Sequence, residues 1–445
     1  MKKFLDITII GGGILGVSLG YFISSVSKSK IGIIEQEENV GHHTSSRNTG
    51  KVHAPFLYNP ETKKTFAKAA FLGYTMWKEY SQIKQIPFIE DGVLEIAKQE
   101  SQINILEKFM KWGFENGLTD KELILLDKND LKKMEPNVSA ISGIYCSRDA
   151  SVDYGLLTRH LANDCIKFGC NLIFNKKFEK IEIDKQERIS IEITDKRNGN
   201  HEQWYTNYLI NAGGSNSINI AHMANTGREY FALYFRGDYW RAPYQYNNLT
   251  RHSIYSVPTF HNFPFLDPHW IIRANGSCEI GPNAIPVFGP FAYDLKTNLK
   301  SILPSISNIV GNKGFWRLCT NKDFLELVTN EMTDISKTKM INRVKKFLPS
   351  IEPRKFLYKG MSGIRSPLIN KQGNFLSDTK IIENQNILHI LNYNSPGATG
   401  VLPIAAALTA KIISKGIISV KKDYENNHGL IWDDSKITEI DIDLY

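Results

Sequence analysis

Residues 6–35, DITIIGGGILGVSLGYFISSVSKSKIGIIE, decide the fold. An apolar run turns through glycines at G-x-G-x-x-G spacing into an apolar stretch of helical length, and a second apolar run follows. Gly11 permits a tight turn, Gly13 lets backbone amides approach a pyrophosphate, and Gly16 lets the helix pack close to its strand. Glu35, which ends the second run, can accept hydrogen bonds from a ribose. The order of these elements predicts a dinucleotide-binding βαβ unit; the alternative is a glycine-rich turn in an ordinary βαβ unit.

The composition is that of a globular protein with more than one domain. Of the 445 residues, 42% are hydrophobic and 22% are charged, and a chain of this length exceeds what one hydrophobic core usually supports. The formal charge of +8 at pH 7 comes from lysines and arginines spread along the chain, without a dense basic block. We therefore expect no nucleic-acid partner. The excess positive charge either belongs to an ordinary solvated surface or attracts anionic substrates or an anionic membrane face.

The cysteines and the N-terminus predict a cytoplasmic protein, with the cytoplasmic membrane face as the alternative. The 5 cysteines show neither C-x-x-C pairing nor a compact cluster with histidine, so we expect no metal site and no disulfide framework. Lys2 and Lys3 precede an apolar stretch that ends near Val26 and mimics a signal peptide. The glycine spacing favours the βαβ unit instead, and we expect no other segment to span a bilayer.

Hydrophobic periodicity places the other elements. Apolar residues at helical spacing predict helices over 62–83, 102–116 and 152–169. Strands are predicted at DGVLEIA (91–97), LIFN (172–175), FEKIEI (178–183) and YLINAGG (208–214). The last of these ends in glycines, which lets the end of a strand approach a ligand without side chains in the way. The stretch 229–349 is rich in aromatics, prolines and short strands and predicts an antiparallel sheet of its own. Residues 360–367, 387–393 and 395–414 return to strand and glycine-turn-helix character.

We therefore expect an α/β fold in which a discontinuous cofactor domain carries an inserted substrate domain. The cofactor domain is predicted at 1–80, 145–228 and 355–420, the substrate domain at 81–144 and 229–354, and a C-terminal tail at 421–445. The sequence shows no internal repeat and no second G-x-G-x-x-G fingerprint, which weighs against enzymes that bind both a flavin and a nicotinamide.

Together these landmarks resemble the D-amino-acid-oxidase-like superfamily of FAD enzymes. Within it, the chain is similar to the L-2-hydroxyglutarate dehydrogenase/oxidase group, with malate:quinone oxidoreductase as a nearby relative. The matching pieces are GGGILG, TSSRNTGKVHA (44–54), DGVLEIA, VDYGLLT, LINAGG, FRGDYW (235–240), IYSVP (254–258), FPFLDPHWIIRANGSCEIGPNA (263–284), SGIRSP, GNFLSD and ILHILNYNSPGATG. The chain departs from the group after Ala54, where Pro55 replaces an expected glycine, and after Arg365, where Ser366 and Pro367 follow.

The resemblance implies an FAD-binding Rossmann-like domain with an inserted antiparallel-sheet substrate domain, and it implies which residues bind FAD. The pyrophosphate, the adenosine ribose and the flavin would be held by Gly11, Gly13, Ile14, Gly16, Glu35, Thr44, Ser45, Arg47, Asn48, Gly213, Gly214, Gly397, Thr399 and Gly400. For the loop at 44–48 the alternative is a solvated turn. We expect FAD to be bound non-covalently. A covalent link to His53 is the alternative, because some sarcosine and dimethylglycine dehydrogenases attach FAD to a histidine in a similar loop.

Oxidation of a 2-hydroxy acid needs a cation for the carboxylate and a base for the hydroxyl proton. Arg365, at the end of the strand GMSGIR, could bind both carboxylate oxygens. Arg273 could hold a second carboxylate if the substrate is a diacid. His53 and His269 are the candidate bases, since the pKa of an unperturbed imidazole lies nearest neutrality.

The predicted function is FAD-dependent oxidation of an L-2-hydroxy acid, most like L-2-hydroxyglutarate, by hydride transfer to flavin N5. The electron acceptor would be oxygen or a quinone, with peripheral membrane contact if it is a quinone. Alternatives on the same fold are malate:quinone oxidoreductase activity and oxidation of an amine or amino acid. From another class, the chain could be a flavin-binding subunit or an inactive homologue.

Overall fold

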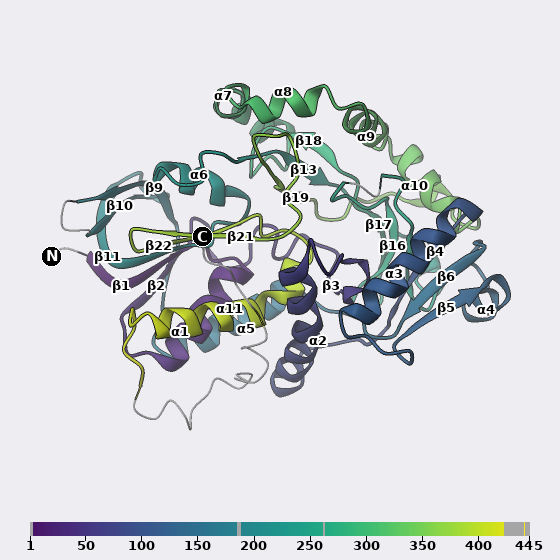
Figure 1. Cartoon of the computed structure of the whole chain (residues 1–445), viewed down its shortest axis with the longest axis horizontal. Helices are drawn as coiled ribbons and strands as arrows, with labels where there is room; N and C mark the ends of the chain where they lie inside the picture. Colours follow the sequence, from purple (N-terminus) through teal and green to yellow (C-terminus); the bar gives the residue numbers. More distant parts are fainter. Residues whose placement is uncertain (1–2, 185–187, 261–262, 422–439, 441–445) are drawn as a thin grey trace.

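The structure, a computed structural model, describes residues 3–184, 188–260, 263–421 and 440. Figure 1 shows two β-rich parts side by side, with a layer of helices beneath the first part and another row of helices along the opposite edge of the molecule. Apart from residues 421 and 440, the predicted tail at 421–445 lies outside the described residues.

The first part is built on a sheet whose described strands number eight, with the order β21-β22-β11-β1-β2-β8 and with β10 and β9 continuing from β11. Its strands are β1 (Lys3–Ile10), β2 (Ile31–Ile34), β8 (Asn171–Ile173), β9 (Lys176–Ile183), β10 (Ile189–Asp195), β11 (His201–Asn211), β21 (Lys380–Asn384) and β22 (Ile387–Leu391). Strands β8, β2, β1, β11 and β22 run parallel, so their carboxyl ends meet at one edge. The beginning, middle and end of the chain therefore meet in one sheet.

Three helices form the layer against this sheet. They are α1 (Ile14–Val26), α5 (Tyr154–Lys167) and α11 (Gly397–Ser414). Every residue of α1 is buried, which explains why its sequence is apolar on all sides. Helix α5 begins at Asp153, whose carboxylate accepts a hydrogen bond from Leu156 N and caps the helix.

Helix α11 is fixed by a close crossing with α2 (Lys64–Lys84). A Cβ added to Gly73 would lie 2.0 Å from the backbone oxygen of Thr399, and one added to Gly400 would lie 2.6 Å from the Cβ of Ala69. By length and composition α11 could cross a membrane, contrary to our expectation for this chain, but 72% of its apolar window is buried within the fold. Contacts with α1 and α2 account for that burial, as in the core helix of a folded domain.

The second part is built on a sheet with seven described strands, in the order β14-β17-β16-β15-β4-β6-β5. They are β4 (Val93–Ala97), β5 (Leu123–Asp127), β6 (Ser142–Cys146), β14 (Trp240–Arg241), β15 (Ser253–Ser256), β16 (His269–Ile272) and β17 (Cys278–Gly281). The pairs are antiparallel except β4 with β15, which are parallel. The predicted α/β class with two kinds of sheet is confirmed. The second sheet is not formed by residues 229–349 alone, because β4, β5 and β6 from earlier in the chain complete it.

Short strands connect the two parts. They are β3 (Lys51–Val52) with β7 (Ala150–Ser151), β12 (Phe231–Ala232) with β20 (Leu368–Ile369), and β13 (Tyr234–Gly237) between β18 (Ile285–Val287) and β19 (Gly363–Arg365). Single 3₁₀ turns occur at η1 (Pro55–Leu57), η2 (Glu100–Gln102), η3 (Gly214–Asn216), η4 (Tyr244–Tyr246) and η5 (Pro353–Lys355).

The predicted helices over 62–83, 102–116 and 152–169 are confirmed by α2, α3 (Ile103–Glu115) and α5. The prediction of short strands throughout 229–349 is wrong for its second half, which is helical. The remaining helices are α4 (Lys128–Met134), α6 (Ser217–Met223), α7 (Leu295–Val310), α8 (Lys313–Cys319), α9 (Lys322–Thr333) and α10 (Lys337–Lys345). Side-chain caps explain the difference, because Asp294, Asn312 and Asn321 each accept a hydrogen bond from a backbone amide at the start of α7, α8 and α9.

Candidate active site

A long cleft lies at the carboxyl edge of the parallel strands, where a doubly wound sheet usually binds its ligand. Two adjoining cavities form it, one of about 420 Å³ beside Glu35 and one of about 180 Å³ that reaches His269 and Arg365. Both cavities are lined by Gly13, Thr44, Ser45, Ala212, Gly214 and Ser215. The cleft is therefore elongated, and mostly small residues line its middle.

The turn between β1 and α1 brings backbone to the wall of the cleft. Gly11 has φ +108°, and a Cβ there would lie 2.6 Å from the carbonyl oxygen of Ala212. A Cβ at Gly16 would lie 1.9 Å from the carbonyl oxygen of Gly11. Gly13 precedes α1 without a side-chain cap, and Ile14 N donates to Ser45 Oγ at 2.9 Å. The helix N-terminus therefore faces the cleft, as an anionic ligand requires.

Glu35 lines the larger cavity at the far end of the cleft. Its Oε2 accepts a hydrogen bond from Gly12 N at 2.6 Å, and its Oε1 accepts one from Glu37 N at 2.8 Å. Burial raises the pKa of Glu35 although these bonds oppose the rise. Each carboxylate oxygen keeps a lone pair that can accept a hydrogen bond from a ribose hydroxyl.

The loop at 44–48 lies along the cleft, and all four of its predicted residues line the smaller cavity. Thr44 Oγ1 donates to the carbonyl oxygen of Ile364. Asn48 braces the loop from inside, because its amide nitrogen donates to the carbonyls of Thr44 and Ser45. The guanidinium of Arg47 lies 4.5 Å from the centre of the Tyr293 ring. Asn48 thus shapes the loop, while Thr44, Ser45 and Arg47 supply polar groups at its surface.

Two glycine-containing turns contribute the remaining predicted residues. Gly213 lines the larger cavity, Gly214 lines both, and Gly397 and Thr399 line the smaller one. Gly400 is not on the wall of either cavity; instead it packs against α2. Its position gives Gly400 a packing role, and its contact with the cofactor stays a prediction.

His269, the first residue of β16, is 1% exposed at the inner end of the smaller cavity. Its Nδ1 donates to the carbonyl oxygen of Asp267 at 2.8 Å. Since a carbonyl can only accept, the proton is on Nδ1 and Nε2 carries a lone pair. Nε2 has no hydrogen-bond partner within the described part of the chain. Burial, together with the positive charge of Arg365, lowers the pKa of His269 to about 3. His269 is therefore a neutral acceptor at pH 7.

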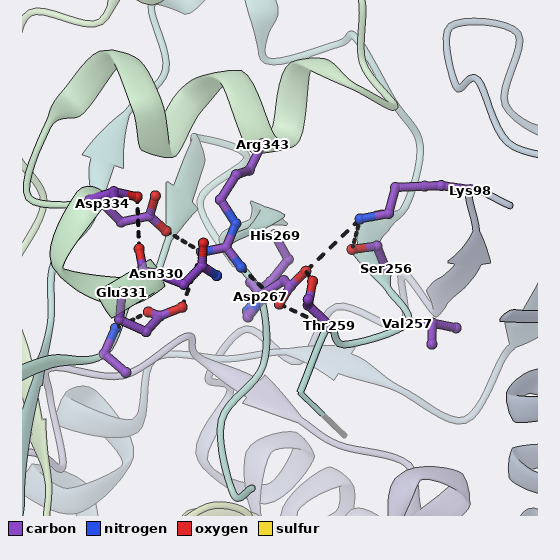
Figure 2. A network of polar contacts seen from close by, with 12 residues as sticks. Lys98, Ser256, Val257, Thr259, Asp267, His269, Asn330, Glu331, Asp334 and Arg343 are labelled. Atoms are coloured by element: carbon purple, nitrogen blue, oxygen red, sulfur yellow. Dashed lines mark hydrogen bonds and ion pairs between the residues drawn. The ribbon is translucent and has the colours of Figure 1, made fainter. Parts of the chain in front are cut away.

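An ion-pair network behind His269 holds Asp267 in place (Figure 2). The Asp267 carboxylate lies 2.8 Å from Arg343 Nη2 and accepts a hydrogen bond from Thr259 Oγ1. Arg343 is paired in turn with Glu331 and Asp334 from α9 and its C-terminus. These contacts fix the segment whose carbonyl sets the tautomer of His269.

Arg365 ends β19 and lines the smaller cavity. Its guanidinium has no hydrogen bond or ion pair with any described residue, although its backbone is held by pairing with Phe235 in β13. Arg365 opposes the rise that burial causes in the pKa of Tyr239, and it lowers the pKa of His269. A cation without a carboxylate partner, close to a neutral imidazole, is suited to binding an anion.

His53 lines the same cavity but has a carboxylate neighbour. Its Nδ1 lies 3.6 Å from Oδ2 of Asp149, and its backbone N donates to Thr399 Oγ1. Lys51, two residues before His53, has a fully buried side chain and lines the same cavity. Its ammonium donates to Asp91 at 2.7 Å and lies 3.8 Å from Oδ1 of Asp149. Lys51 and Asp149 were not predicted as site residues, although Lys51 lies two residues before His53 in TSSRNTGKVHA.

Arg273 does not line the cavity, so its predicted role as a second carboxylate ligand is not supported by its position. Its Nε donates to Glu279 Oε2 at 3.0 Å, and its Nη1 donates to the carbonyl oxygen of Asn48. The β16–β17 hairpin brings this carboxylate to Arg273, because it pairs Ile271, two residues before Arg273, with Glu279. Arg273 thus anchors the loop at 44–48.

Two tyrosines on the cavity wall were also missed. Tyr255 stacks on His269 with ring centroids 4.0 Å apart, and its hydroxyl is buried without a partner among described residues. Tyr239 lies nearby on the same wall. An aromatic residue in an apolar strand is usually predicted to lie in the hydrophobic core. The sequence carried no sign that these two tyrosines face a cavity.

A cleft with a backbone-lined middle that ends at an imidazole and a guanidinium fits a dinucleotide-dependent oxidoreductase. Residues 6–411 match the family model DAO, described as FAD dependent oxidoreductase. The chain belongs to this family of enzymes.

Relatives and solved structures agree with that assignment. The chain is 30% identical over 410 residues to an L-2-hydroxyglutarate dehydrogenase of Indibacter alkaliphilus, covering 91% of this chain and 97% of that protein. It is 28% identical to the mitochondrial L-2-hydroxyglutarate dehydrogenase of Homo sapiens, over 92% of this chain and 88% of that protein. The fold is similar to that of dithionite-reduced L-alpha-glycerophosphate oxidase from Mycoplasma pneumoniae with FAD bound, with a TM-score of 0.73 at 20% identity, covering 96% of this chain and 98% of that one.

Proposed function

We propose that this FAD-dependent oxidoreductase converts an L-2-hydroxy acid, most like L-2-hydroxyglutarate, into the 2-oxo acid. The observation that carries the proposal is the pair of Arg365 and His269 in one cavity, a cation with no acidic partner in the described part of the chain and a neutral acceptor. The relatives named L-2-hydroxyglutarate dehydrogenase support the same substrate class.

The cleft fits FAD, because Gly11 and Gly13 line its wall at the N-terminus of α1, where backbone amides can approach a pyrophosphate. Residues that would hold the cofactor are Gly11, Gly13, Ile14, Glu35, Thr44, Ser45, Arg47, Gly213, Gly214, Gly397 and Thr399. The chemistry that FAD supplies when bound is acceptance, at N5, of the hydride from C2 of the substrate.

The chain's own residues orient the substrate and take its proton. Arg365 would bind both oxygens of the carboxylate next to C2. Nε2 of His269 would accept the hydroxyl proton while C2 loses its hydride, so that a C=O bond forms and the 2-oxo acid results. A bound carboxylate would neutralise Arg365 and so remove one cause that lowers the pKa of His269. The base becomes stronger when the substrate is in place. His53, beside Asp149, would orient the ring system rather than act as the base.

We expect the purified protein to lose its flavin absorbance anaerobically with L-2-hydroxyglutarate, and to respond more weakly to malate, lactate and amino acids. Arg365→Met should raise the KM for the hydroxy acid by about tenfold or more, since a hydrogen bond to a charged group contributes about 1.5–3 kcal/mol. Arg365→Lys should recover part of the loss. Bleaching by amines alone would overturn the proposed substrate, and a flavin that no acid or amine reduces would favour an inactive homologue.

The pH dependence of kcat/KM tests which histidine is the base. Because the pKa of His269 lies near 3, below the ordinary imidazole value, its acceptor form persists as the pH falls from 8 to about 5. We expect no acid limb in that range, and we expect His269→Asn to lose far more activity than His53→Asn. A fall in kcat/KM on acidification with an apparent pKa of about 6.5, the ordinary imidazole value, would contradict the assignment.

We further propose that FAD is held without a covalent bond. The His53 imidazole lies 3.6 Å from the Asp149 carboxylate, and its backbone N is held by Thr399. A covalent link would instead require a ring nitrogen of His53 to be bonded to the flavin. Acid precipitation should leave the yellow colour in the supernatant. A yellow pellet would show a covalent link and reassign His53.

For the electron acceptor we propose a membrane quinone, reached from an exposed apolar face on α7. Leu295, Leu299 and Leu303 are 72%, 57% and 81% exposed at successive turns of this helix. Lys296 and Lys300 flank them and are exposed as well. Figure 1 shows α7 and α8 along one edge of the molecule. Exposed leucines beside lysines suit an anionic membrane surface. A cytoplasmic location stays a prediction.

The membrane proposal is tested by co-sedimentation with phosphatidylcholine vesicles with and without phosphatidylglycerol. We expect binding that increases with the anionic lipid and that falls at least about tenfold in Leu299→Glu/Leu303→Glu, since each buried leucine contributes about 1.5–3 kcal/mol. Ile166→Glu, an exposed apolar position on α5, is the matched control. The proposal would be contradicted if the protein does not bind vesicles. If it is also a dimer in solution, and the double variant is a monomer, the face is instead an interface with a second copy of the chain.

A further inference from the structure

A second chamber of about 410 Å³ adjoins the reaction cavity. The two share His53, Leu266, Arg365, Asn394 and Ser395 on their walls. Arg365 therefore lies between the reaction cavity and the second chamber, and a ligand bound to it can extend into either.

The walls of the chamber combine aromatic rings with polar side chains, and the charges among their described residues are positive. Its aromatic residues are Tyr58, Phe66, Phe109, Trp112, Phe263, Phe265 and Phe375. Its cationic side chains are Lys63, Lys108 and Arg365, and no aspartate or glutamate is among its described lining residues. Such a chamber favours an anion attached to an apolar chain.

Like Arg365, Lys63 is a cation of this chamber without an acidic partner in contact among the described residues. Its ammonium makes no hydrogen bond or ion pair with any described residue and lies 5.7 Å from the centre of the Tyr58 ring. Burial lowers the pKa of Lys63, and only the more distant carboxylate of Asp378 opposes this. Lys108, in contrast, is exposed and lies over the Trp112 ring at 4.7 Å. A bound carboxylate would restore to Lys63 the interactions that burial removes.

A chain of hydrogen bonds ties the start of α2 to the residue after Arg365. Thr65 N donates to the Asp378 carboxylate, and Asn392 donates to the Asp378 carbonyl. Asn394 donates to Asn392 and accepts a hydrogen bond from Ser366 N. The segment that carries Lys63 and the strand end that carries Arg365 are thus held in a fixed relation by short, directed bonds.

We propose that Lys63 binds the distal carboxylate of a dicarboxylic substrate, with the methylene chain of the substrate against the aromatic walls of the second chamber. Lys63 takes the role that Arg273 cannot fill, because Glu279 already neutralises Arg273. The inference rests on the proposed function and adds to it the reason why a diacid is preferred over a monoacid.

The test compares L-2-hydroxyglutarate with L-2-hydroxypentanoate, which has the same carbon chain but a methyl group in place of the distal carboxylate. Lys63→Met should raise the KM for hydroxyglutarate by about 10-fold or more, because a charged hydrogen bond is lost, and should change kcat less than twofold. The KM for hydroxypentanoate should not rise, and Lys63→Arg should restore selectivity for the diacid. Lys64→Met, at the exposed neighbouring position, is the matched control.

A binding measurement separates this inference from the proposed reaction. Glutarate carries both carboxylates but no hydroxyl, so its dissociation constant can be measured from the change in flavin absorbance without turnover. Weaker glutarate binding in Lys63→Met supports the carboxylate site even if no hydroxy acid is oxidised, which would sink only the proposed reaction. An equal rise in KM for both acids, or glutarate binding that the variant does not change, would overturn the assignment of Lys63.

Discussion

The close backbone contact at the turn between β1 and α1 is the constraint on which the cleft depends. Gly11 approaches Ala212 at the end of β11, and Gly16 approaches Gly11, at separations that no Cβ would allow. This contact joins segments about two hundred residues apart in the chain and aligns the ends of the parallel strands at one edge. The N-terminus of α1 consequently faces the cleft, and the backbone at Gly11 and Gly13 lines the wall where a pyrophosphate would fit.

At the other end of the cleft, desolvation decides the chemistry. A buried imidazole beside a guanidinium is costly to charge, so His269 stays neutral, and the carbonyl of Asp267 fixes its proton on Nδ1. Leaving Nε2 without a partner costs about 1–3 kcal/mol, a penalty that a substrate hydroxyl would remove on binding. The ion pairs of Arg343 with Asp267, Glu331 and Asp334 keep that arrangement rigid from behind. The site is thus preorganised for a ligand with a hydroxyl next to a carboxylate.

How much the sequence could predict depended on whether the signal was local. Glycine spacing in 11–16 and the glycines that end β11 report backbone geometry directly, so the dinucleotide fold and the edge that holds the site were accessible. Helices α7 to α9 were missed because prolines and aromatics outweighed the capping residues that precede them. The pairing of Arg273 with Glu279 is set by the β16–β17 hairpin, which sequence spacing alone does not show. Tyr255 and Lys63 face cavities that form only when distant segments pack.

The most direct measurement is a crystal structure of the protein with its FAD chemically reduced and with L-2-hydroxyglutarate bound, because reduced FAD cannot accept the hydride and the substrate stays intact. We expect the carboxylate next to C2 on Arg365 and the hydroxyl oxygen within hydrogen-bond reach of His269 Nε2, roughly 2.6–3.2 Å. A ligand whose hydroxyl faces His53, or whose adjacent carboxylate is bound by another cation, would contradict the assignment.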